Sequence, residues 1–217
     1  MTERILAYDR SIVPQETGWW CGPASTQVVL DSRGIHVSER ELANRIGTTT
    51  DGTNYVGLIA PILRDYLGDG YIERYIENDP ATPEQVEQLW RDIRASIDAG
   101  FGVVANIVAP PSNYPRGVMG SESPAYSGGT VFHYVAIMGY SDDGDRAVWV
   151  ADSGFRPFGY WCSFAQMATL IPPKGYTAAP GKAGPMKKQR GLDFAAARPG
   201  AANVNAAATE RCQARDH

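Results

Sequence analysis

Patterns typical of helices dominate the first half of this 217-residue chain, and patterns typical of strands dominate the second half. This order predicts an α+β fold, in which a helical lobe packs on an antiparallel β-sheet. Predicted helices cover residues 22–33, 38–46, 55–67, 82–99 and 163–170. Predicted strands cover residues 71–76, 102–108, 132–140 and 146–151, and residues 5–14 form a short strand or an extended arm.

A change in composition divides the chain near residue 174. The preceding part has the length and apolar content of one compact domain, which we assign to residues 1–173. From Lys174 onward Ala, Gly, Pro, Lys and Asn prevail, and large apolar side chains are rare. Such a segment buries too little surface to offset the entropy lost on ordering, so we predict a flexible tail or linker over residues 174–217.

The charge distribution argues against nucleic acid as a partner. Residues 174–217 contain eight Lys and Arg against three Asp and Glu, whereas the rest of the chain contains twelve basic and twenty-one acidic residues. Binding to phosphate groups needs a basic face, which so acidic a body lacks. No apolar run reaches 18 residues and the polar N-terminus does not resemble a secretory signal, so we expect no stable insertion into a membrane. We also expect a monomer.

The three cysteines, Cys21, Cys162 and Cys212, are too few and too widely spaced for a disulfide framework. No Cys-x-x-Cys pair or cluster of Cys and His suggests a zinc site, so we expect neither a metal nor another cofactor. Cys162 lies among aromatic residues and is expected to pack in the core, and Cys212 falls in the predicted tail. A reduced Cys21 is the remaining candidate for chemistry.

Cys21 stands directly before Gly22-Pro23, at the predicted start of a helix. The positive end of a helix dipole favours a thiolate at this position. A thiol that attacks a carbonyl group needs hydrogen-bond donors for the developing oxyanion, and its own backbone N–H is one of them. Gln15, six residues earlier on an extended segment, is positioned to supply a side-chain amide as the second donor. We therefore predict Cys21 as a nucleophile and Gln15 as its oxyanion donor.

His133 and Asp152 are the candidates for the base and for the residue that orients the base. If Asp143-Gly144 forms a two-residue hairpin turn, Asp152 lies opposite Val135. His133 then lies diagonally across from Asp152 on the same face of the sheet, within reach of a hydrogen bond. Such a carboxylate would fix the imidazole tautomer and stabilise the imidazolium.

Each of these residues also has a purely structural interpretation. An isolated cysteine is often a small buried apolar residue, and His133 alone could be a hydrogen-bonded core histidine. Asp152 could cap the turn at Ser153-Gly154, and Gln15 could lie on the surface. Their agreement in chain order, spacing and sheet face favours the catalytic interpretation.

Three further residues are candidates for substrate binding. Trp19 and Trp20 directly precede the nucleophile; one of them belongs to the core and the other lines the cleft, and the sequence does not decide which. Ser153, beside Asp152, is the third candidate. The loop over residues 109–130 is long enough to act as a lid or as an edge of the binding site, with disorder as the alternative.

The segments Gln15–Pro23, His133–Ala136 and Val150–Ser153 resemble the motifs of family thirty-nine of the cysteine peptidases, which are papain-like enzymes best known for trimming bacteriocin leader peptides. Residues 15–23 and 47–53 are more similar still to the N-terminal peptidase domain of mycobacteriophage and other actinobacteriophage endolysins (lysin A). By position, the resemblance implies Cys21 as nucleophile, His133 as base, Asp152 as orienter and Gln15 as oxyanion donor. The family often has Asp-Pro where this chain has Asp152-Ser153.

The endolysin resemblance implies an endopeptidase that hydrolyses the peptide part of bacterial peptidoglycan during host lysis. It further implies synthesis in the host cytoplasm, access to the wall through a lysis partner, and a tail that leads to another lytic or wall-binding module. Two alternatives stay open: a peptidase that processes the leader of a secreted peptide, and a catalytically inactive domain of the same fold that only binds a peptide. The bond that is cut is not determined by the sequence.

Overall fold

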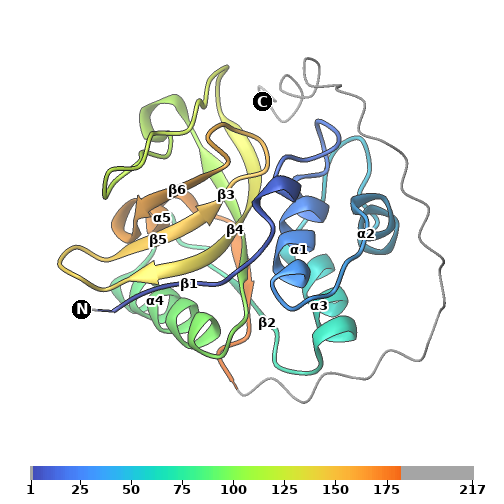
Figure 1. The fold of residues 1–217 in the computed structure, drawn as a ribbon. Coiled ribbons are helices and arrows are strands. Elements are labelled where there is room, and N and C mark those ends of the chain that lie inside the picture. The colour runs from blue at the N-terminus through green and yellow to red at the C-terminus, as the bar shows by residue number, and fades with distance from the viewer. Residues whose placement is uncertain (1, 182–217) are drawn as a thin grey trace.

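The computed structural model describes residues 2–181 (Figure 1). The strands are β1 (Glu3–Ile5), β2 (Ile72–Tyr75), β3 (Val103–Ala109), β4 (Val131–Ser141), β5 (Ala147–Ala151), β6 (Gly159–Ser163) and β7 (Gly175–Ala178). The α-helices are α1 (Cys21–Asp31), α2 (Glu39–Ile46), α3 (Ile59–Leu67), α4 (Pro83–Asp98) and α5 (Phe164–Leu170). The short 3₁₀ helices η1 (Arg10–Ile12), η2 (Val56–Leu58) and η3 (Pro111–Asn113) lie within connections.

The strands form one antiparallel sheet that lies between two groups of helices (Figure 1). Their order is β2-β7-β3-β4-β5-β6, and β1 pairs with β4. Because side chains alternate along a strand, Val135 and Ile137 of β4 pack with α4 and α5, whereas Ala136 and Met138 pack with α1, α2 and α3. The predicted α+β class and the helical lobe on an antiparallel sheet are confirmed.

Local signals in the sequence explain where several helices begin and end. Ser38 caps α2 by accepting the N–H of Glu41, and Gly47 ends that helix at a φ of 76°, a left-handed conformation that favours glycine. Thr82 and Gln85 form both halves of a capping box at the start of α4. The predicted helices therefore appear close to their expected positions.

The β4–β5 hairpin differs from the predicted one in its turn. Ser141 pairs with Ala147, so residues 142–146 connect the strands and the predicted two-residue turn at Asp143-Gly144 is wrong. A bulge between Ile137 and Gly139 then shifts the pairing by one residue. As a result Ala136 pairs with Ala151, which is the register predicted for the end of the hairpin that carries His133 and Asp152.

The predicted boundary between domain and tail at residue 174 is also wrong. The β7 strand lies inside the sheet, between β2 and β3, and its residues Tyr176, Thr177 and Ala178 are buried. A four-residue strand with one large apolar side chain gives a weak signal, and only pairing on both sides makes it part of the domain. The β6 strand was also not predicted. The predicted tail beyond residue 181 lies outside the described residues.

Candidate active site

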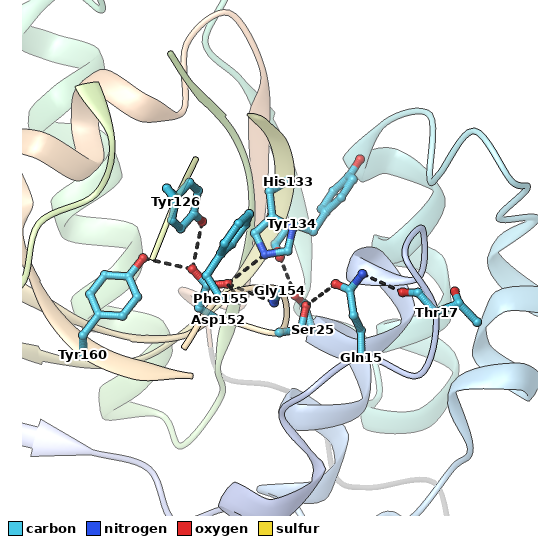
Figure 2. Close-up of polar contacts among 11 residues, drawn as sticks. Gln15, Thr17, Ser25, Tyr126, His133, Tyr134, Asp152, Gly154, Phe155 and Tyr160 are labelled. Atoms are coloured by element: carbon cyan, nitrogen blue, oxygen red, sulfur yellow. Dashed lines mark hydrogen bonds and ion pairs between the residues drawn. The ribbon is translucent and has the colours of Figure 1, made fainter. Parts of the chain in front are cut away.

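His133 and Asp152 meet at one end of the sheet. His133 is the third residue of β4 and is 1% exposed, and Asp152 directly follows β5 and is 0% exposed. The ring Nε2 of His133 lies 2.9 Å from Oδ1 of Asp152 (Figure 2). The sequence prediction that this aspartate contacts this histidine is confirmed. A carboxylate on Nε2 favours the tautomer with a proton there, which leaves Nδ1 as the nitrogen for proton exchange with a thiol.

The carboxylate of Asp152 accepts four hydrogen bonds in addition to its contact with His133. Its Oδ2 accepts the hydroxyls of Tyr126 at 2.8 Å and Tyr160 at 3.1 Å (Figure 2). Its Oδ1 accepts the backbone N–H groups of Gly154 at 3.1 Å and Phe155 at 3.2 Å. Burial of a charge costs free energy unless hydrogen bonds compensate for it, and this arrangement supplies them.

The same contacts keep the two tyrosines protonated. Burial, and next the negative charge of Asp152, raise the pKa of Tyr126 and of Tyr160 well above the ordinary value. Both hydroxyls therefore remain donors to Asp152 across the physiological pH range.

Aromatic rings and a glycine enclose the imidazole of His133. The Phe155 ring lies edge-on to it with centroids 5.6 Å apart, and Tyr126 stacks on Phe155 at 3.8 Å. A Cβ at Gly154 would lie 3.0 Å from Cε1 of His133, so the ring approaches the backbone more closely than a larger residue would allow. These apolar contacts exclude water and fix the plane of the ring.

Cys21 is the first residue of α1 and is 5% exposed. Val29 of α1 and Met138 of β4 both lie against Gly102, and one turn earlier the Ser25 hydroxyl donates to the carbonyl of Tyr134 at 3.1 Å (Figure 2). The helix therefore runs parallel to β4, and Cys21, one turn before Ser25, lies toward the end of the strand that carries His133.

Electrostatics give a second indication of where the Cys21 thiol lies. Burial, and next the charge of Cys21, raise the pKa of Tyr134 above its ordinary value. The charge of Cys21 thus acts on the residue that follows His133 in β4. The start of α1 has no side-chain cap on Trp20, so its first N–H groups remain suited to bind an anion.

Gln15 connects the segment before Cys21 with the segment after Asp152. Its backbone N–H donates to the carbonyl of Ser153 at 3.0 Å, and the Ser153 hydroxyl donates to its Oε1 at 2.9 Å. Its amide Nε2 donates to the carbonyl of Thr17 at 2.6 Å (Figure 2). The structure thus brings Gln15 next to the His133–Asp152 pair, from positions far apart in the sequence.

The residues predicted to bind substrate have different environments. Trp19 and Trp20 are both half-buried, and the guanidinium of Arg40 lies 5.7 Å from the centroid of the Trp20 ring. Ser153 is 3% exposed and bonded to Gln15. The substrate-binding role of all three stays a prediction.

Cys162 has the structural role that the sequence predicted. It lies in β6 at 0% exposure, and burial raises the pKa of its thiol to about 12. A thiol with that pKa stays protonated and unreactive at neutral pH. Cys212 lies outside the described residues.

The sequence interpretation missed Tyr126, Tyr160, Gly154 and Phe155 as parts of the site. Gly154 and Phe155 come two and three residues after Asp152, and an Asp-x-Gly turn is a usable signal for backbone donors. Tyr126 belongs to the loop that was interpreted as a lid or binding edge, and it reaches Asp152 only through the tertiary fold.

Within residues 2–181 no cluster of three or more His, Cys, Asp or Glu side chains could hold a metal ion. Among the helices of that same part of the chain, none has the length and apolar character needed to cross a membrane.

A comparison with protein families identifies a match over most of the chain. Residues 8–169 match the Peptidase_C39 like family. The chain belongs to this family. The matched range contains all four residues predicted for catalysis, every element from η1 to β6, and α5 except for its last residue. The family resemblance inferred from the motifs is confirmed at this level.

The individual proteins that are similar to this chain match it over short segments or at low sequence identity. An uncharacterized protein of Methanothermobacter marburgensis is 49% identical over 51 residues, which is 24% of this chain, and one of Methanothermobacter thermautotrophicus is 43% identical over 51 residues. The chain spans only 36% of the length of either relative. The peptidase domain of Streptococcus ComA, a bi-functional ABC transporter involved in a quorum sensing pathway, is 18% identical with a TM-score of 0.44, covering 76% of this chain and 95% of that one. The wall substrate stays a prediction.

Proposed function

We propose that this protein is a cysteine endopeptidase in which Cys21 is the nucleophile and His133 is the base. The observation that carries the proposal is the buried contact between His133 Nε2 and Asp152, at the end of β4 against which the first turn of α1 packs. A histidine that served only packing would not require a carboxylate with four further donors behind it. The same contact disfavours an inactive peptide-binding domain.

The residues account for each step of peptide cleavage. The Nδ1 atom of His133 removes the thiol proton, and the sulfur of Cys21 attacks the carbonyl carbon of the scissile bond. The backbone N–H of Cys21 and the amide of Gln15 donate to the resulting oxyanion. The imidazolium then protonates the leaving amine, and water releases the acid product from the thioester with His133 again as base. Asp152 stabilises the imidazolium between these steps.

For the substrate we propose the leader segment of a secreted peptide as the first candidate. The family match extends over residues 8–169, whereas the resemblance to endolysins rests on two short motifs, residues 15–23 and 47–53. Those motifs support peptidoglycan peptides as the second candidate. Both substrates contain an amide bond that the same machinery would attack.

The thiol mechanism is tested by substitution of the two described cysteines. We expect Cys21→Ala to reduce peptide hydrolysis by at least about 1,000-fold, because the nucleophile is lost. Cys162→Ala is the matched control, and it should retain the activity because the Cys162 thiol is buried and protonated. Hydrolysis that survives in Cys21→Ala would rule out this mechanism.

The substrate is tested by mass spectrometry of two reactions with the wild-type protein. One reaction contains unstructured peptides of varied sequence, and the other contains purified peptidoglycan. Release of new amino groups from the sacculus would establish the wall substrate, and cleavage of linear peptides alone would favour the leader substrate. The Cys21→Ala variant is the blank in both reactions.

A further inference from the structure

Two hydrogen bonds join Gln15 to Ser153. The backbone N–H of Gln15 donates to the Ser153 carbonyl, and the Ser153 hydroxyl donates to Oε1 of Gln15 at 2.9 Å. Ser153 is 3% exposed, so water competes little for these bonds. Its hydroxyl is engaged inside the protein, which leaves little of it to contact a substrate.

The contacts also determine which way the Gln15 amide is turned. A backbone carbonyl only accepts hydrogen bonds, so the atom at 2.6 Å from the Thr17 carbonyl must be the amide nitrogen. The amide oxygen then faces Ser153, whose hydroxyl serves as the donor. The Thr17 carbonyl excludes the flipped amide, and the Ser153 hydroxyl satisfies the amide oxygen. Without Ser153, a rotation of the Gln15 side chain out of this position would break one hydrogen bond fewer.

We propose that Ser153 is a positioning residue that holds the Gln15 amide in the orientation needed for oxyanion binding. This inference rests on the proposed function and assigns Ser153 a role in place of direct substrate contact. Gln15 has two N–H hydrogens on its amide, and only an amide with its nitrogen toward the thiol can donate to the oxyanion. Ser153 follows Asp152 directly, so one short segment orients both the base and the oxyanion donor.

The affected step is acylation of the thiol. The sulfur of Cys21 forms a bond to the carbonyl carbon, and the π electrons of the C=O bond move to oxygen as the oxyanion. Collapse of this intermediate restores the C=O bond and expels the leaving group, which takes a proton from the imidazolium or departs as an anion. Alkylation of the same thiol by iodoacetamide displaces iodide and creates no oxyanion. A comparison of the two rates therefore distinguishes a loss of oxyanion stabilisation from a loss of thiol reactivity.

The test measures both reactions in wild type, Ser153→Ala, Ser153→Cys, Gln15→Ala and the double variant. The acyl donor is 4-nitrophenyl acetate, and iodoacetamide is the alkylating agent. We expect Ser153→Ala to slow acylation about 10-fold and Gln15→Ala about 100-fold, with no further loss in the double variant. The Cys side chain has the connectivity of Ser with a larger sulfur atom and a weaker donor, and it should give an intermediate rate.

Alkylation provides the control for a merely structural effect. Its rate and pH profile report the thiol and His133, so we expect both to be unchanged in Ser153→Ala. Ser153→Cys is left out of this control, because its added thiol also reacts with iodoacetamide. Two results would overturn the role of Ser153. One is that Ser153→Ala slows acylation by the same factor in the wild-type and in the Gln15→Ala background, and the other is that Ser153→Ala does not slow acylation at all. If Ser153→Ala does not fold, the graded rate of Ser153→Cys decides between these results.

Failure of the proposed function has a different signature. A wild-type protein that is not acylated by the ester, and whose Cys21 reacts with iodoacetamide no faster than a free thiol, would refute the thiol mechanism itself. An acylated wild type with an unaffected Ser153→Ala variant would refute only the positioning role.

Discussion

Asp152 combines two roles that the sequence presented as alternatives. It contacts His133, and it caps the following turn by accepting the N–H groups of Gly154 and Phe155. This capped turn also places Gly154 against the imidazole ring of His133. The predicted turn cap and the predicted contact with His133 therefore occur together, because the capped turn holds the carboxylate beside the imidazole.

The hydroxyls behind Asp152 give a prediction at this scale. Tyr126→Phe removes one hydrogen bond to a buried carboxylate, so we expect the free energy of unfolding to fall by about 2 kcal/mol. We also expect kcat to fall several-fold, because the carboxylate is held less firmly. Denaturant unfolding and peptide hydrolysis measure the two effects.

Tyr114→Phe is the matched control in the same loop. Its hydroxyl donates to the backbone carbonyl of Gly129, a neutral acceptor outside the site. We expect a loss of about 1 kcal/mol with kcat retained. Equal effects of the two substitutions on kcat would contradict the role assigned to Tyr126.

At the scale of elements, the start of α2 anchors the segment that carries Gln15. Glu39, the first residue of α2, is buried, and its carboxylate accepts the backbone N–H of Glu16 at 3.0 Å. Burial raises the pKa of Glu39 to about 8; the hydrogen bond from Glu16 lowers it and the charge of Glu16 raises it. This helix therefore contacts the segment that carries Gln15 through a carboxyl group with a pKa of about 8.

This pKa gives a prediction for stability against pH. The folded protein keeps the Glu39 proton up to about pH 8, whereas the unfolded chain releases it near the ordinary value of 4.5. The contribution of Glu39 to stability is thus fully present below about pH 4.5 and is lost as the pH rises to about 8. Glu39→Gln stays neutral and keeps a carbonyl acceptor for Glu16. We expect its stability advantage over wild type to be on the order of 2 kcal/mol larger at pH 8 than at pH 5.

Denaturant unfolding at the two pH values measures the difference. Glu84→Gln is the control, because Glu84 is exposed and also lies in the first turn of a helix. We expect that variant to show no pH-dependent advantage. The same lack of pH dependence in Glu39→Gln would show that Glu39 is ionised in the folded protein at neutral pH.

The β4–β5 hairpin shows how an element can be predicted correctly through two departures that cancel. The connection over residues 142–146 displaces the register by one residue relative to a two-residue turn, and the bulge after Ile137 restores it. Local propensity reveals an Asp-Gly turn signal, but neither the final loop length nor a bulge follows from it. His133 and Asp152 share a face because the pairing at Ala136 and Ala151 is decided by packing on both sides of the sheet.

At the scale of the whole molecule, β7 closes the sheet between β2 and β3. Its Tyr176 is buried, and the Tyr176 hydroxyl donates to Asp92 of α4 at 2.8 Å. Asp92 also forms an ion pair with Arg74 of β2. The short strand β7 thus connects the edge strand β2, the strand β3 and helix α4.

Truncation tests this role. A chain that ends at residue 173 loses β7, which leaves β2 without a partner strand and exposes the edge of β3, so we expect loss of the cooperative thermal transition. A chain that ends at residue 181 retains every described element and is the control. A stable fold for the shorter chain would contradict the assignment of β7 to the domain.

The sequence by itself determined the class of fold and the helix that starts at Cys21. These depend on local signals: the apolar period of each segment, capping residues and turn residues. The tertiary structure alone decided the place of β7, the contact of Tyr126 with Asp152, and the two hydrogen bonds between Gln15 and Ser153. Those features join segments far apart in the chain, and their free energy comes from burial and hydrogen bonds that exist only once the sheet has formed.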